Sequence, residues 1–93
     1  MVIGLLRVDL MLPDCNSLKE KRSVLKRQIF RIRKNYNAAV AETASQDLWR
    51  RAELSFVTVN SDIAVAEKTL RNILADLDSH PVLEVLADQM EML

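Results

Sequence analysis

The residues from Val2 to Leu12 alternate with a period of two, which constrains the fold more than any other feature of the chain. The even positions of this run are all apolar or glycine, whereas the odd positions include Arg7 and Asp9. Side chains of a strand point alternately to its two faces, so the run predicts a strand with one fully buried face. Pro13 is expected to end it.

A helix is predicted to follow this strand. Ser17 and Glu20 form a capping box, in which the serine oxygen accepts a backbone N–H at the helix start and the glutamate reaches back. The helix is expected to end near residues 35–37. Its apolar residues recur at helical spacing and form one stripe; they are Leu18, Leu25, Ile29, Ile32 and Tyr36.

The rest of the chain predicts three strands and one helix. The runs 38–43 and 54–59 are rich in β-branched and small residues and favour strands. Asn60-Ser61-Asp62 supplies N-cap residues for a second helix, which His80-Pro81 ends. Residues 82–92 predict the final strand.

The predicted order is therefore βαββαβ. This order is typical of the α+β class and predicts a single ferredoxin-like domain over residues 1–93, a four-stranded antiparallel sheet with two helices on one face. The expected core residues are Leu6, Val8, Leu25, Ile29, Ile32, Leu54, Leu70, Ile73 and Leu77.

Length and composition exclude several classes of protein. With 93 residues, 49% hydrophobic and 28% charged, the chain fits one globular domain and not a disordered one. One cysteine, Cys15, excludes an intrachain disulfide, and with one histidine, His80, it is too small a ligand supply for an ordinary zinc site. No signal-like start or long apolar span appears, so we expect a cytoplasmic protein that does not enter a membrane.

The net charge of zero hides a strong asymmetry. Residues 18–34 contain eight Lys and Arg against Glu20 alone, a balance of +7, whereas residues 62–93 have a balance of −5. On a helical wheel four of these cations gather on one flank of the apolar stripe, where they could follow a phosphate backbone, namely Lys19, Arg22, Lys26 and Arg33. The alternative is a solvated helix face that offsets the acidic half. The predicted RNA contacts are Lys19, Lys21, Arg22, Lys26 and Arg33.

Phe30 falls within the cationic face of the same wheel. An exposed aromatic ring flanked by arginines could stack on an unpaired base. An isolated exposed ring, or a contact with a partner subunit, would explain it equally well.

The segment before the third strand contains a second candidate site, formed by Gln46, Asp47 and Trp49. A large ring on a polar connection either closes the edge of a core or marks an interface. We expect Trp49 to close the core, with the interface as the alternative.

No set of residues indicates catalysis. Cys15 and His80 lack a third group that would orient them as a nucleophile pair, and no phosphate-binding glycine loop or metal-ligand spacing occurs. We therefore expect no enzyme activity, no cofactor and no metal. The odd face of the first strand carries Ile3, Leu5 and Met11 with no third helix to cover it, which predicts a homodimer surface.

The string from Ser17 to Lys26, placed just after Leu12-Pro13, resembles the opening of the YlxP-like family of small bacterial proteins, a domain of unknown function. Asn37 with Val40-Ala41-Glu42, the segment Gln46–Trp49, and Asn60-Ser61-Asp62 agree with the family in the same order. The resemblance implies a ferredoxin-like fold and no known activity. Because the family's genes tend to lie among those of translation and ribosome assembly, it also implies a ribosomal context.

Together these observations predict a non-enzymatic accessory factor for translation or ribosome maturation. It would contact RNA or a ribosomal subunit through the first helix, without DNA sequence specificity. The alternative is a homodimeric module for protein interaction or small-ligand sensing that binds no nucleic acid.

Overall fold

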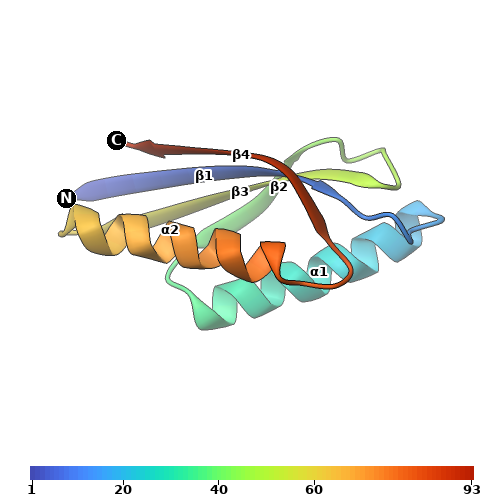
Figure 1. Ribbon diagram of the computed structural model, residues 1–93, viewed down its shortest axis with the longest axis horizontal. Coiled ribbons are helices and arrows are strands. Elements are labelled where there is room, and N and C mark those ends of the chain that lie inside the picture. Colours follow the sequence, from blue (N-terminus) through green and yellow to red (C-terminus); the bar gives the residue numbers. More distant parts are fainter.

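The computed structural model describes residues 1–93 and contains six elements in the predicted βαββαβ order (Figure 1). The third strand begins at Arg51, three residues before the run that predicted it, and the other boundaries differ from the expected ones by two residues or fewer. The elements are β1 (Val2–Met11), α1 (Leu18–Asn35), β2 (Ala39–Ala44), β3 (Arg51–Asn60), α2 (Ile63–Asp78) and β4 (Glu84–Met92).

The four strands form one antiparallel sheet in the order β2-β3-β1-β4. In the centre of the sheet Leu6 of β1 lies opposite Phe56 of β3 and Met90 of β4. Both helices cover the same face, with α2 over β1, β3 and β4 and α1 along β2 (Figure 1). The α+β class and the ferredoxin-like arrangement are confirmed.

The core lies between the sheet and the two helices. The even residues of β1 point into it, and Leu6, Val8 and Leu10 have no exposed surface. The matching residues of β3 are Ala52, Leu54 and Phe56, which are also buried. Eight of the nine predicted core residues are buried, whereas Ile29 is half-buried against the core because it faces the open side of α1.

Side-chain caps define where the helices begin. The Ser17 Oγ accepts a hydrogen bond from the Glu20 backbone N–H at 3.1 Å, as predicted. The Glu20 carboxylate accepts from the Asn16 backbone N–H at 2.7 Å, one residue earlier than in the standard capping box. Asp62 caps α2 by accepting from Ala64 N–H at 2.8 Å. Neither helix is long and apolar enough to cross a membrane.

The opposite face of the sheet carries no helix. One half of this uncovered face is charged, and Arg51 there donates to Asp9 at 2.5 Å. The other half is apolar, because Val57 and Val59 of β3 are 37% and 49% exposed beside the half-buried Ile3 and Leu5.

Candidate functional site

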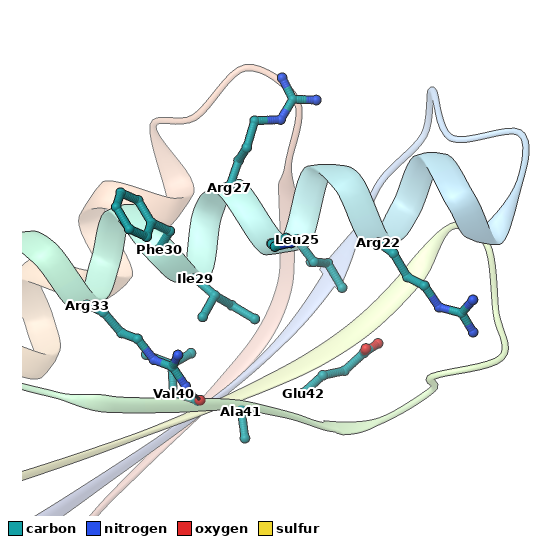
Figure 2. Close-up of a pocket in the computed structure, with 10 residues that line it drawn as sticks. Arg22, Leu25, Arg27, Ile29, Phe30, Arg33, Val40, Ala41 and Glu42 are labelled. Atoms are coloured by element: carbon teal, nitrogen blue, oxygen red, sulfur yellow. Dashed lines mark hydrogen bonds between the residues drawn. The ribbon is translucent and has the colours of Figure 1, made fainter.

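An open groove of about 840 Å³ runs between α1 and the edge strand β2 (Figure 2). It is the largest cavity described in the molecule, and we call it the α1–β2 groove. Its lining residues are Arg22, Leu25, Lys26, Arg27, Ile29, Phe30, Arg33, Val40, Ala41 and Glu42.

The floor of the groove is apolar and its edges are cationic. Leu25 and Ile29 extend from α1 toward β2, where Val40 faces them (Figure 2). Arg22 and Arg33 lie at the two ends of this floor, and the Arg33 Nη2 donates to the Val40 carbonyl at 2.9 Å. The groove thus combines an apolar base with guanidinium groups at its rim.

The structure brings most of the predicted RNA contacts to one surface. Lys19, Arg22, Lys26 and Arg33 are exposed, and none of them forms an ion pair with a carboxylate. The ring of Phe30 is 69% exposed, which agrees with its predicted place on this side of the helix. We call the four cations Lys19, Arg22, Lys26 and Arg33 the α1 basic face.

The placement predicted for Lys21 is wrong. Its side chain is buried, with only 1% of its surface exposed. The Lys21 Nζ donates a hydrogen bond to the Ser45 carbonyl at 2.6 Å and lies 2.9 Å from the Glu42 Oε2. The Gln46 carbonyl accepts from the same ammonium at 3.4 Å. The segment after β2 folds over the first turns of α1, so Lys21 is enclosed by it and cannot reach a phosphate.

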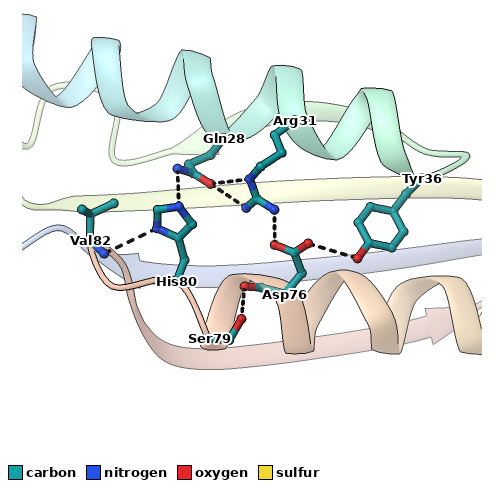
Figure 3. Close-up of polar contacts among 7 residues, drawn as sticks. All are labelled: Gln28, Arg31, Tyr36, Asp76, Ser79, His80 and Val82. Carbon is teal, nitrogen blue, oxygen red and sulfur yellow. Dashed lines mark hydrogen bonds and ion pairs between the residues drawn. The ribbon is translucent and has the colours of Figure 1, made fainter.

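The acidic half of the chain neutralises little of α1. The only ion pair between α1 and residues 62–93 joins Arg31 to Asp76 of α2 (Figure 3). Tyr36 donates from its hydroxyl to the same carboxylate at 3.0 Å, and burial together with this contact raises the pKa of the Tyr36 phenol. These contacts join the two helices and leave the α1 basic face unpaired.

Two further polar side chains extend this contact between the helices. The Gln28 amide is buried and lies 3.1 Å from the His80 Nε2, which belongs to the turn after α2 (Figure 3). The Gln28 Oε1 accepts from Arg31 at 2.6 Å. Buried polar atoms need such partners, so this set positions α1 against the end of α2.

The prediction that Trp49 closes the core is wrong. Its side chain is 52% exposed at the tip of the β2–β3 connection, and Gln46 and Asp47 beside it are also exposed. Polar contacts hold the two ends of this connection, through Lys21 at one end and Arg50 at the other, where Arg50 Nε donates to the Cys15 carbonyl at 3.0 Å. The tip between them therefore remains in solvent. The interface formed by these three residues stays a prediction.

Cys15 and His80 have separate surroundings. Burial raises the pKa of the Cys15 thiol, and the nearby carboxylates of Glu20 and Asp14 add to the shift. The thiol therefore stays protonated near neutral pH and is a poor nucleophile. His80 contacts Gln28 and the Val82 backbone N–H instead. No group of three His, Cys, Asp or Glu side chains lies together in a way that could hold a metal ion.

Glu42 is the groove residue that sequence reasoning missed. It is the only carboxylate among the lining residues. The sequence does contain a sign of its role. Glu42 occupies an inward-facing position of β2 (Ala39–Ala44), whose other residues are small or apolar. An acidic side chain at such a position requires a buried cationic partner, which is Lys21.

Comparison with known proteins agrees with the resemblance described above. The chain is 37% identical over 83 residues to the uncharacterized protein YlxP of Bacillus subtilis (strain 168), and the match covers 89% of this chain and 90% of that protein. Residues 3–90 match the family described as a protein of unknown function (DUF503). The chain therefore belongs to the DUF503 family, which includes YlxP-like proteins.

Proposed function

We propose that this protein is a non-enzymatic accessory factor of translation or ribosome maturation that binds RNA through the α1 basic face. The observation that carries the proposal is that Lys19, Arg22, Lys26 and Arg33 are exposed and form no ion pair. Cations that no carboxylate neutralises are free to replace the counterions of a polyanion. A cytoplasmic location with RNA or a ribosomal subunit as partner is part of the proposal.

The spacing of these cations suits a nucleic-acid backbone. At a rise of about 1.5 Å per residue, the part of α1 between Lys19 and Arg33 is roughly 20 Å long. Phosphates of one strand are separated by about 3.4 Å along a helix axis, so several of them fit beside this row. Such contacts give affinity without sequence information, which agrees with the expectation of no DNA sequence specificity.

Removing two of these cations is expected to reduce the salt dependence of RNA binding. In the Arg22→Ala, Lys26→Ala double variant, two phosphate contacts are lost, each worth a slope of roughly −0.7 to −0.9 in log K against log salt. If the protein engages about four phosphates, its slope of roughly −2.8 to −3.6 should become about half as steep. A filter-binding titration with ribosomal RNA between low and moderate salt measures this slope.

The matched control removes two cations from the other helix. Lys68 and Arg71 of α2 are exposed and lie outside the α1–β2 groove, so the double variant Lys68→Ala, Arg71→Ala should retain the slope of the unaltered protein. Equal slopes for both double variants, or no RNA binding at low salt, would contradict the proposal.

The uncovered sheet face favours a second candidate function, that of a homodimeric module for protein interaction or small-ligand sensing. Val57 and Val59 expose apolar surface at one end of this face beside Ile3 and Leu5. Burial of such surface against a second copy would stabilise a chain of this size.

This second candidate predicts a dimer that depends on β3. The unaltered protein should sediment as a dimer at high micromolar concentration, and the Val57→Lys, Val59→Lys variant as a monomer. Because Val57 and Val59 are exposed, lysine at these positions buries no charge in the monomer. The circular-dichroism spectrum of the variant should therefore match that of the unaltered protein. A strict monomer before substitution would exclude this candidate.

A further inference from the structure

We infer that the α1–β2 groove binds one unpaired nucleotide of the RNA, with the base on the apolar floor and its amino group on the Glu42 carboxylate. The inference rests on the proposed function, because it names what that surface recognises. It commits to single-stranded RNA with an exposed base that carries an amino group: guanine, cytosine or adenine, and not uracil.

The shape and lining of the groove suit a flat, mostly apolar ring. Its volume of about 840 Å³ lies within the roughly 300–1,000 Å³ range of small-molecule sites. Leu25, Ile29 and Val40 provide the floor on which a base would lie. The bases of a duplex are stacked and paired, so only an unpaired base could enter.

The rim of the groove suits the phosphates on either side of such a base. Arg22 and Arg33 lie at its two ends. Lys26, which also lines the groove, lies between them in the sequence of α1. All three side chains are exposed and free of ion pairs. A strand lying along the groove would therefore meet cations before and after the inserted base.

Glu42 distinguishes this groove from a surface that only attracts phosphates. A carboxylate repels phosphate, so beside its pairing with Lys21 the Glu42 side chain offers the groove a hydrogen-bond acceptor and not a further phosphate contact. Its Oε2 lies 2.9 Å from the buried Lys21 Nζ, whereas no protein group donates a hydrogen bond to Oε1. The side chain retains 20% exposure and points from β2 toward α1 (Figure 2). One acceptor oxygen is thus positioned at the groove by a fixed ion pair.

A carboxylate selects bases by what their edges donate. Such a group only accepts hydrogen bonds, and acidic side chains are known partners of the cytosine amino group. The one free oxygen can accept from the amino group of guanine, cytosine or adenine. Uracil has no amino group, and its one ring N–H on the pairing edge lies between two carbonyl oxygens, which the carboxylate repels. Glu42 is therefore expected to disfavour uracil.

The backbone of β2 argues against an extended peptide as the occupant. A peptide that added to this edge would need the outward carbonyls of β2 as acceptors. The Val40 carbonyl already accepts from Arg33, and the Glu42 carbonyl accepts from Gln46 Nε2 at 3.4 Å. Side chains thus cover the edge, as is usual for strands that must not pair.

The test measures binding of fluorescein-labelled RNA nonamers to the full chain by fluorescence anisotropy at low salt. The probes are nine uridines, the same strand with a central guanosine or cytidine, and a nine-base-pair duplex. The guanosine strand should bind about fivefold or more tighter than the uridine strand, at the lower end of what a base contact provides because the groove is open. The duplex should bind no tighter than the uridine strand.

The variant Glu42→Gln supplies the second arm. Because an amide both accepts and donates hydrogen bonds, the variant should bind the uridine and guanosine strands with nearly equal affinity. The amide oxygen still provides an acceptor for the Lys21 ammonium. The comparison of nonamers on the unaltered protein needs no variant and stands if Glu42→Gln fails to fold.

The outcomes separate this inference from the proposed function. Equal binding of all single strands would overturn the base site while leaving RNA binding intact. Absence of binding to every nonamer and to ribosomal RNA would overturn both. Binding of an acidic peptide but of no RNA would assign the groove to a protein partner and also overturn the inference.

Discussion

Replacing Lys21 by Ala is expected to lower the free energy of unfolding by about 3 kcal/mol. The substitution leaves the Glu42 carboxylate without its partner and the Ser45 and Gln46 carbonyls without their donor. Removing one member of a buried pair costs about 3–5 kcal/mol, and we expect the lower end because Glu42 keeps 20% of its surface in solvent.

Urea unfolding followed by circular dichroism measures the change. Lys19, two positions earlier on the same helix, is exposed and unpaired, so Lys19→Ala should change stability by no more than about 0.5 kcal/mol. The double variant Lys21→Met, Glu42→Leu removes both charges and should recover much of the loss. A loss below about 1 kcal/mol for Lys21→Ala would show that the pair is not a structural contact.

Replacing Phe56 by Ala is expected to destabilise the protein by about 4 kcal/mol. Phe56 has no exposed surface and lies on β3 between Leu6 of β1 and Val40 of β2. Its removal leaves a cavity at the centre of the core that neighbouring strands cannot close without breaking their pairing. Stabilities of native domains are about 5–15 kcal/mol, so the variant should be partly unfolded at 37 °C.

The other phenylalanine provides the matched control. Phe30 is 69% exposed, so Phe30→Ala should leave the unfolding midpoint within experimental error. If the ring stacks on a base, the same variant should bind single-stranded RNA more weakly, because such a contact is worth about 1–3 kcal/mol. Equal destabilisation by Phe56→Ala and Phe30→Ala would contradict the difference in burial between the two side chains.

The alternation in the strands predicted the sheet well. The even residues of β1 face the core because no other arrangement hides all of them. The start of β3 was predicted too late, because Arg51 and Glu53 are charged. These residues face the uncovered side of the sheet, where Arg51 pairs with Asp9, while Ala52 between them is buried. The alternation of buried and exposed side chains thus continues through Arg51–Glu53, although the charges of this segment are typical of a loop between strands.

The phase of α1 was predicted less well. The residues buried on this helix are Lys21, Leu25, Gln28 and Ile32, so two polar residues occupy the stripe. A wheel built on apolar residues alone turns the helix toward Ile29. Lys21 lies next to Ile32 on that wheel, and it was expected at the surface because it is charged. The buried polar positions become predictable only when their partners, Glu42 and His80, are known to lie beside them.

The candidate site could be predicted only in part. The cations of α1 are visible as a charge run, but the groove requires that α1 lie along β2, which follows from tertiary packing and not from either segment alone. Trp49 shows the same limit, since the polar contacts that keep the β2–β3 tip in solvent come from Lys21 and Arg50.

The position of β1 in the middle of the sheet has a consequence for how the chain folds. Strand β1 pairs only with distant segments, since Asp9 meets Arg51 at a separation of 42 residues and Arg7 meets Gln89 at 82. Doubling a loop adds only about 0.6 kcal/mol of closure entropy, so chain length does not decide which neighbour pairs first. Buried contacts decide it: β3 contributes Phe56 and Leu54 to the core, whereas β4 has no fully buried residue. We therefore expect hairpin β2–β3 and β1 to form the folding nucleus and β4 to close the sheet last, which φ-values near zero for substitutions in β4 would confirm.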